Sequence, residues 1–206
     1  LDIYDKLADY HYQNQAVLVE NGDDGDSFNY SPPRQDLEIF STNSKFDYRI
    51  DGSSLYQKIT INYEMIIPAN LQERAKQQTS IKLPVILEVV LRKGSKVIDL
   101  NVHVDNHGLS HRLCILFDSA LTTRFNYADQ QFGLIKRPNS YDKEMKLYLE
   151  GLSNQEKIEK PKELVNWAND QSTWQEPPIS IEPTQSYVAL TDESRGIAVI
   201  PQGVRE

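Results

Sequence analysis

The stretch that decides the fold is residues 80–118, SIKLPVILEVVLRKGSKVIDLNVHVDNHGLSHRLCILFD. Apolar residues occupy every second position of residues 81–91 and again of residues 98–104. A period of two is typical of a β-strand that buries one of its faces. Lys93-Gly94-Ser95 lies between the two runs, and a glycine at that place favours a tight turn. We therefore expect a long β-hairpin here.

A third run follows the polar break at residues 105–108. It predicts a strand over residues 111–117, with Leu113, Ile115 and Phe117 on one side. Three strands in succession predict an antiparallel meander. Because one face of such a sheet is apolar, a second layer must cover it.

The rest of the chain continues the β pattern. Similar runs predict strands over residues 2–7, 16–20, 36–40, 45–50, 54–67, 123–127, 131–135, 185–190 and 196–200. A turn is expected at Asp129. Residues 71–78 are rich in helix formers but too few for a stable helix, so they predict an exposed turn or a linker. Residues 141–165 are charged and poor in large branched side chains, which is typical of a surface insertion. The pattern predicts an all-β fold with one β-sandwich domain over residues 1–206.

The composition excludes several classes of partner. The 206 residues carry 30 acidic and 22 basic side chains, a net charge of −8, which is not the basic footprint needed for nucleic acid or an anionic membrane. No apolar run is long enough to cross a bilayer, and the first residues have no signal-peptide pattern, so we expect a soluble protein. The single cysteine, Cys114, permits no internal disulfide and predicts an inert buried thiol in a reducing compartment. Strand-like patterns close to both ends predict a piece cut from a longer protein.

Residues 20–33, ENGDDGDSFNYSPP, combine acids, amides, glycines and prolines. This predicts an ordered loop with Phe28 and Tyr30 as aromatic anchors. Its acidity is similar to that of a calcium-binding EF-hand loop, but no glutamate stands where the terminal bidentate ligand belongs. A solvated loop is the favoured interpretation, and a calcium or sugar site is the alternative.

A cluster of ionisable side chains falls within nine residues: His103, Asp105, His107 and His111. Imidazole and carboxylate groups suit zinc. One face of a two-layer sheet is commonly polar, however, and no second group elsewhere in the sequence completes a site. We therefore assign no metal to this cluster. The sequence also contains no G-x-S-x-G nucleophile motif and no phosphate-binding glycine loop.

Five separated stretches occur in a recognisable order and spacing. They are residues 25–33 (GDSFNYSPP), residues 106–117 (NHGLSHRLCILF), Gln131-Phe132-Gly133 with Arg137-Pro138, residues 174–177 (WQEP), and residues 187–192 (YVALTD) with 196–199 (GIAV) and 203–206 (GVRE). Each stretch alone is weak. Together, over residues 2–206, they resemble the C-terminal β region of family 38 glycoside hydrolases, the α-mannosidases, and most closely the bacterial, cytosolic branch of that family.

The resemblance implies a retaining exo-α-mannosidase. Its nucleophile, its acid/base carboxylate and its zinc site would lie in an N-terminal α/β domain that is absent from this chain. Retention requires two carboxylates about 5 Å apart. The resemblance further implies an antiparallel supersandwich of the galactose-mutarotase-like type, truncated at both ends, with no catalytic residue, no metal ligand and no cofactor of its own. The expected partners are an α-mannoside carbohydrate and the catalytic domain, in a cytoplasmic protein that forms a homodimer at full length.

One loop is expected to reach the substrate. In the family, a loop of the β region offers an aromatic hydroxyl to the sugar at the active-site rim, and residues 25–30 match it best. The bacterial pattern usually has tyrosine where this chain has Phe28, so that hydroxyl is missing here. Either Tyr30 or Asp26 supplies the polar contact, or the loop is only structural, which is the favoured alternative. Asp26, Phe28 and Tyr30 are therefore the candidate substrate-binding residues.

Two further functions stay open from the sequence. The first is a stand-alone carbohydrate-binding β-sandwich with Trp167, Trp174, Tyr30 and Phe28 as its platform. The second is a mutarotase-like enzyme that uses histidine and glutamate as acid and base. The main hypothesis is a non-catalytic β domain that buttresses the catalytic domain of an α-mannosidase.

Overall fold

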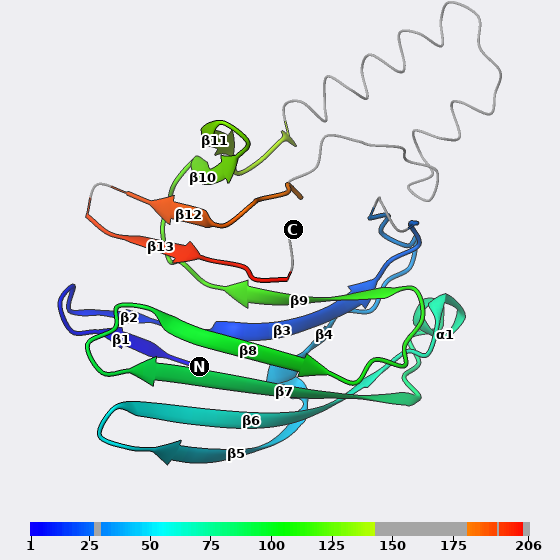
Figure 1. Ribbon diagram of the computed structural model, residues 1–206. Coiled ribbons are helices and arrows are strands. Elements are labelled where there is room, and N and C mark those ends of the chain that lie inside the picture. Colours follow the sequence, from blue (N-terminus) through cyan, green and yellow to red (C-terminus); the bar gives the residue numbers. More distant parts are fainter. Residues whose placement is uncertain (27–29, 143–180, 193, 204–206) are drawn as a thin grey trace, which may run out of the picture. The chain divides into compact units, whose positions relative to one another are not determined.

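The computed structural model describes residues 1–26, 30–142, 181–192 and 194–203. Nearly all of the regular structure in these residues is β-strand (Figure 1). This confirms the predicted all-β, antiparallel fold. The chain divides into two compact units, Ala16–Leu116 and Leu1–Gln15 with Phe117–Glu206. In the described residues, no helix is long and apolar enough to cross a membrane.

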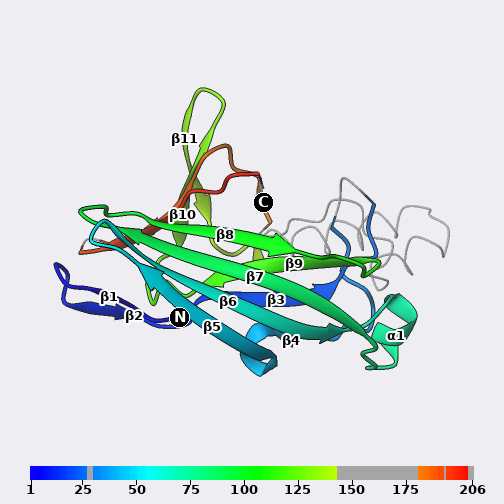
Figure 2. The same ribbon diagram turned by 60° about the horizontal axis from the view of Figure 1, so that its bottom comes forward.

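Two β-sheets form the unit Ala16–Leu116 (Figures 1 and 2). The larger sheet has the order β5-β6-β7-β8, with bounds Lys45–Gly52, Tyr56–Ile67, Ile81–Arg92 and Ile98–Val104. The smaller sheet has the order β4-β3-β9, with bounds Ile39–Phe40, Gln15–Gly22 and His111–Phe117. A short 3-10 helix, Ser41–Asn43, follows β4.

The core of this unit is built from both sheets. Leu18 of β3 meets the fully buried side chains of β6 and β7: Met65, Ile67, Leu83 and Val85. Leu113 and Ile115 of β9 pack against the same cluster, on the side that alternation predicts. Because apolar faces of two sheets meet in one core, the unit is a β-sandwich.

The predicted hairpin is confirmed. Strand β7 pairs with β8 in antiparallel register from Val85↔Val104 to Leu91↔Ile98. The turn between them contains Gly94, whose φ of 76° lies in the left-handed region that glycine adopts without strain. The two long strands β6 and β7 pair along their full length.

The predicted meander is wrong at its third strand. Strand β9 joins β3 in the smaller sheet and is not a neighbour of β8. Alternation shows which face of a strand is apolar, but it does not show which strand will be its partner. The segment between β8 and β9 carries the chain to the other layer, so β9 faces the core from the opposite side.

The prediction of an exposed turn or a linker at residues 71–78 agrees with the exposure of most of these residues but missed a short helix. These residues begin with helix α1, Leu71–Ala75. The Asn70 side chain caps it by accepting hydrogen bonds from the backbone N–H groups of Gln72 and Glu73, at 3.0 Å each. The helix buries Arg74 completely, so tertiary contacts stabilise a segment too short to be helical alone.

The second unit contains a hairpin and a four-stranded sheet. The hairpin pairs β1, Ile3–Asp5, with β2, Tyr10–Tyr12. The sheet has the order β11-β10-β12-β13, with bounds Gly133–Pro138, Phe125–Gln130, Val188–Thr191 and Gly196–Val199. The turn expected at Asp129 is displaced, because Asp129 lies within β10. Residues 143–165 of the predicted insertion lie outside the described residues.

Candidate functional site

The candidate rim loop, residues 23–33, begins directly after β3. Its neck is closed by backbone bonds from Asp24 N–H to the Ser31 carbonyl (2.8 Å) and from Asp23 N–H to the Ser110 carbonyl (3.0 Å). The Asp23 carboxylate accepts the N–H groups of Gly25 (2.9 Å) and Ser31 (3.1 Å). An aspartate that bonds backbone N–H groups two and eight residues ahead fixes the conformation of the loop at its start.

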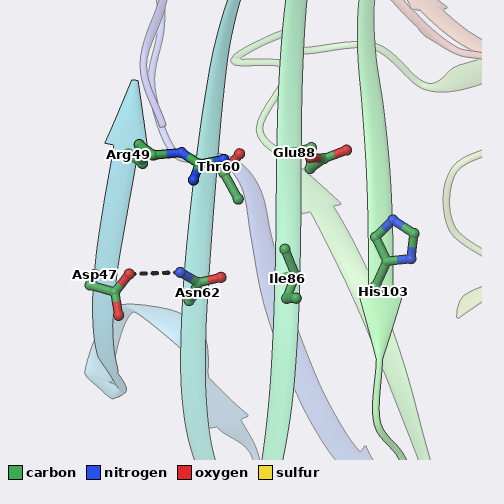
Figure 3. Close-up of a pocket in the computed structure, with 7 residues that line it drawn as sticks. All are labelled: Asp47, Arg49, Thr60, Asn62, Ile86, Glu88 and His103. Atoms are coloured by element: carbon green, nitrogen blue, oxygen red, sulfur yellow. Dashed lines mark hydrogen bonds between the residues drawn. The ribbon is translucent and has the colours of Figure 1, made fainter. Parts of the chain in front are cut away.

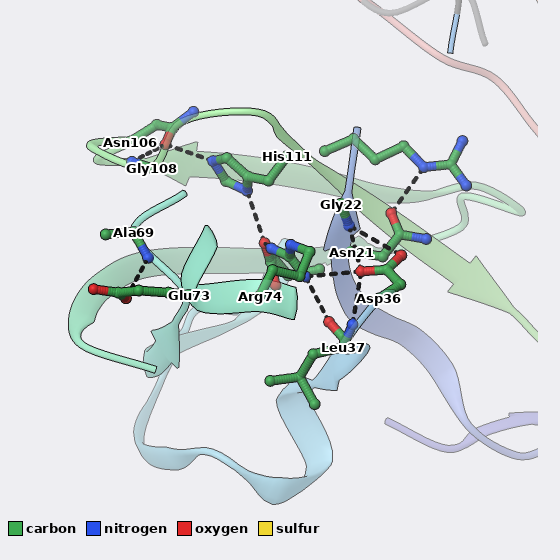
Figure 4. A network of polar contacts seen from close by, with 12 residues as sticks. Asn21, Gly22, Asp36, Leu37, Ala69, Glu73, Arg74, Asn106, Gly108 and His111 are labelled. Atoms are coloured by element: carbon green, nitrogen blue, oxygen red, sulfur yellow. Dashed lines mark hydrogen bonds and ion pairs between the residues drawn. The ribbon is translucent and has the colours of Figure 1, made fainter. Parts of the chain in front are cut away.

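Beneath the loop lies a buried ion pair. Glu20 of β3 and Arg74 of α1 are both enclosed, with side-chain exposures of 0% and 1%. The guanidinium donates to Glu20 Oε1 through Nη2 (Figure 4). A buried charge is tolerated only when it is paired and hydrogen-bonded, so each of these two residues requires the other.

A second carboxylate joins this pair from the far end of the loop. Asp36 Oδ1 lies 3.1 Å from Arg74 Nη1 and accepts the N–H groups of Leu37 (2.7 Å) and Gly22 (3.0 Å). Arg74 Nη1 also donates to the Leu37 carbonyl at 2.6 Å. Residues 36 and 37 are therefore held by the same guanidinium that holds β3, so both ends of the loop share one anchor.

Close packing around Arg74 explains a glycine at the start of the loop. A Cβ atom at Gly22 would lie 2.6 Å from both Arg74 Cδ and Pro33 Cγ. That is well inside van der Waals contact. Glycine therefore leaves the space in which β3, Pro33 and the buried arginine pack together.

His111 of β9 completes the anchor. Its Nδ1 lies 3.1 Å from Glu20 Oε1, and its Nε2 lies 2.9 Å from Asn106 Oδ1 (Figure 4). The same Asn106 oxygen accepts the Gly108 N–H at 2.9 Å. We name Glu20, Asp36, Arg74 and His111 the anchor cluster.

Above the anchor cluster, Tyr30 packs against Arg112 of β9. The guanidinium carbon lies 3.5 Å from the centre of the Tyr30 ring, and Nε donates to Asn21 Oδ1 at 2.9 Å. Burial raises the pKa of the Tyr30 hydroxyl, and the positive charge of Arg112 opposes this rise only in part. The phenol therefore keeps its proton at neutral pH and can both donate and accept a hydrogen bond, as recognition of a sugar hydroxyl requires.

The structure treats the three predicted site residues differently. Tyr30 is half-buried and held by Arg112, as described above. Asp26 is exposed on the loop. Phe28 lies outside the described residues, as do Trp167 and Trp174, which the sequence offered as a sugar platform.

The histidines of the predicted cluster do not converge. His103 lies on the outer face of β8, His107 pairs with Asp105 at 3.0 Å in the solvent, and His111 is buried in the anchor cluster. Within the described ranges, no three His, Cys, Asp or Glu side chains are grouped so as to hold a metal ion.

No local pattern marks the anchor cluster, because in the sequence Glu20, Asp36 and Arg74 look like ordinary surface charges. A signal was nevertheless present in the stretches that carry the family resemblance. Residues 106–117 supply His111 and Arg112, and residues 25–33 supply Tyr30. The structure brings these two stretches together at the base of the loop.

The model of the family described as "Glycosyl hydrolases family 38 C-terminal domain" matches residues 2–206. The chain belongs to this family. The match covers almost the whole chain and confirms the resemblance found in the five sequence stretches.

Individual relatives agree with this family. A protein of Halalkalibacterium halodurans named "Putative mannosylglycerate hydrolase" is 24% identical over 159 residues, which are 68% of this chain and 18% of that protein. The crystal structure of an alpha-mannosidase from Enterococcus faecalis V583 superposes on 97% of this chain with a TM-score of 0.73 at 18% identity. A second family 38 glycosyl hydrolase from Enterococcus faecalis does so with a TM-score of 0.70 at 17% identity.

These proteins are much longer than the present chain. It covers 18% of the Halalkalibacterium protein and 21% and 22% of the two Enterococcus chains. The structural likeness shows that this family 38 C-terminal domain has the same β fold as the corresponding parts of those proteins.

Proposed function

We propose that this domain is the non-catalytic β region of a retaining exo-α-mannosidase. The observation that carries the proposal is the match of residues 2–206 to the family's C-terminal domain. The names of the Halalkalibacterium and Enterococcus relatives support an α-mannoside as the substrate class. A mannosylglycerate is one member of that class.

The chemistry of the described residues supports a non-catalytic role. A retaining glycosidase needs two free carboxylates flanking the glycosidic bond. The best-organised carboxylates here are instead occupied with structure: Glu20 and Asp36 bind Arg74, and Asp129 binds a neighbouring loop. In this proposal the nucleophile, the acid/base group and the zinc ion belong to a separate catalytic domain, which the β region buttresses.

The loop of residues 23–33 is the proposed contribution to the active-site rim. Three features support it: the anchor cluster holds both ends of the loop, Asp23 shapes its start, and Arg112 holds Tyr30 with a protonated hydroxyl. A preorganised hydroxyl can contribute binding energy at the transition state without being a reacting group. Asp26 and Phe28 are the other proposed contacts of this rim.

The parent enzyme is further proposed to be a cytoplasmic homodimer. The support for the cytoplasm is the single cysteine of this chain, Cys114, which is half-buried and unpaired on β9. The support for the dimer is the family resemblance alone.

The proposal is tested by assaying the 206-residue chain and its parent enzyme side by side on an aryl α-mannoside, with and without added zinc. We expect turnover by the parent and none by the chain, because in this proposal the carboxylate pair belongs to the separate catalytic domain. Far-ultraviolet circular dichroism dominated by β-structure serves as the control for folding. Zinc-dependent turnover by the purified chain would place the catalytic groups in this domain, and a parent inactive on every α-mannoside would remove the substrate class.

A further inference from the structure

The larger sheet has a pocket on the face that points away from the core. The pocket has a volume of about 630 Å³, within the ~300–1,000 Å³ range of small-ligand sites. Figure 3 shows its lining residues side by side on the four strands β5 to β8: Asp47, Arg49, Thr60, Asn62, Ile86, Glu88 and His103. None of these residues belongs to the loop of residues 23–33 or to the anchor cluster.

Strand register explains how the pocket is assembled. One row crosses all four strands, because Asp47 pairs with Asn62, Asn62 with Ile86, and Ile86 with His103. A second row, two residues further along, holds Arg49, Thr60 and Glu88. With strands about 4.8 Å apart and about 3.3 Å per residue, the two rows span roughly 14 by 7 Å. That area matches the footprint of two linked sugar rings.

The lining has the chemistry of a polyol site. Hydrogen-bonding side chains surround Ile86, an apolar side chain that is 40% exposed. Asn62 Nδ2 donates to Asp47 Oδ1 at 2.7 Å, which leaves the second carboxylate oxygen to accept from a ligand. A sugar could lie with its C–H face on Ile86 and its hydroxyls toward Asp47 and Asn62.

Glu88 is a charged acceptor in the pocket. Lys58 Nζ donates to Glu88 Oε1 at 2.9 Å. This bond, aided by the positive charges of Lys58 and His103, lowers the pKa of the Glu88 carboxyl. Glu88 is therefore ionised at neutral pH, and a carboxylate is among the best acceptors for paired sugar hydroxyls.

Other ligand classes fit this pocket less well. Two carboxylates, Asp47 and Glu88, line it together with Arg49, and Lys58 pairs with Glu88, so the charges balance and favour no ionic ligand. In the described part of the chain no group of ligating side chains is suited to a metal ion. An apolar ligand would have to desolvate six polar side chains around one isoleucine.

From these observations we propose that the outer face of the β5–β8 sheet is a binding site for a short, uncharged oligosaccharide. The existence of this site does not depend on the α-mannosidase function proposed above.

The chain offers a matched pair of variants for the test. Glu88 lines the pocket and bonds Lys58 at 2.9 Å, whereas Glu64 lies outside it on the same face and bonds Lys82 at 2.8 Å. Glu88→Gln and Glu64→Gln each remove one carboxylate–lysine pair from one sheet face. If Glu88→Gln loses sugar binding and Glu64→Gln does not, the sugar binds in the pocket, and a general loss of surface charge does not explain the result.

The experiment is an NMR titration of the 15N-labelled 206-residue chain with mannotriose and, separately, with maltotriose. We expect at least one trisaccharide to bind with a dissociation constant of about 1 mM or tighter, with shifts at the amides of residues 60–62 and 86–88. Glu88→Gln should weaken binding about tenfold or more, because a bond to a charged acceptor is lost, and Glu64→Gln should not. Binding of inorganic phosphate in place of both sugars, shifts elsewhere, or no binding of either sugar to the folded chain would each overturn the proposal.

Discussion

Two loops in this domain, residues 23–33 and 184–187, are each held by a carboxylate, but the partners of the two carboxylates differ. In the anchor cluster, Glu20 is fully buried and its partners are the ionic and imidazole groups of Arg74 and His111. Asp129 instead lies at the surface of β10. There it accepts backbone N–H groups from Gln185 (3.1 Å), Ser186 (2.8 Å) and Tyr187 (3.1 Å).

The difference shows what each loop depends on. Leaving a buried carboxylate without its cation lowers the stability of the fold by several kcal/mol, so the anchor cluster depends on Arg74. A half-buried carboxylate among neutral donors does not depend on one cation, but its hydrogen bonds require that it stay ionised. We expect the first arrangement to be sensitive to mutation and the second to pH.

The largest expected effect comes from Arg74→Met. The methionine keeps much of the apolar stem but leaves Glu20 buried without its cation. We expect the free energy of unfolding to fall by about 3–5 kcal/mol, a large share of the roughly 5–15 kcal/mol that stabilises a typical domain. Urea unfolding of the chain, followed by circular dichroism, measures this loss.

Two further variants sharpen this prediction. Arg49→Met removes an exposed pair with Asp51, whose side chains are 70% and 42% exposed, and should cost less than about 1 kcal/mol. The double variant Glu20→Met with Arg74→Met removes both buried charges, including Glu20 Oε2 and Arg74 Nε, which have no hydrogen-bond partner in the described residues. It should recover part of the stability lost in Arg74→Met. A cost below about 1 kcal/mol for Arg74→Met would show that the ion pair is not an anchor.

A smaller effect is expected for Asp129→Asn. Hydrogen bonds, chiefly from the hydroxyl and the N–H of Ser186, hold the pKa of Asp129 well below its ordinary value of 3.8. Because the folded pKa is the lower one, the carboxylate stabilises the fold above the unfolded pKa, and this contribution is lost as the pH falls through the folded pKa. The asparagine variant should therefore have a lower Tm at pH 7, and the difference from wild type should shrink below about pH 4.

Asp118→Asn is the matched control for this pH dependence. Asp118 directly follows β9, and among the contacts of the described residues its carboxylate accepts one backbone N–H, that of Ala120 at 2.9 Å. Its replacement should lower Tm less than Asp129→Asn does. Equal losses in the two variants, or a loss for Asp129→Asn that persists unchanged at pH 3, would contradict the assigned role of Asp129.

Much of the fold could be predicted from alternation alone. The β7–β8 hairpin, the long strand β6 and the core side of β9 follow the period of two in their apolar residues. The partner of β9 could not be predicted, because a period of two describes a face and not a neighbour. The strand predicted over residues 36–40 is only Ile39–Phe40 in the structure, because Asp36 binds Arg74 in the anchor cluster.

The candidate site was predictable only in part. The sequence predicts Tyr30 as a site residue because its surrounding motif resembles the family, whereas no motif marks Glu20 or Arg74. They are 54 residues apart, and a charged residue is normally exposed. The folded chain shows that α1 places Arg74 next to Glu20, where the two charges form the buried ion pair of the anchor cluster.

The smallest expected change in stability, and the most direct test of the rim, comes from Tyr30→Phe in the parent enzyme. Removing the hydroxyl should lower kcat/KM by an amount equivalent to about 1–3 kcal/mol, since a polar contact to the distorting sugar is lost. The Tm should hardly move, because the ring keeps its contact with Arg112. Tyr63→Phe is the control. The Tyr63 hydroxyl bonds Ser41 beside the core, so its loss should lower Tm and leave kcat/KM unchanged.

The central claim is that the anchor cluster holds a loop whose tyrosine serves the substrate of a catalytic domain. Measuring kcat/KM and Tm on the single variant Tyr30→Phe tests this most directly. We expect a lowered kcat/KM on an aryl α-mannoside with an almost unchanged Tm. Wild-type kinetics combined with a lowered Tm would contradict it and would make Tyr30 a packing residue of a purely structural loop.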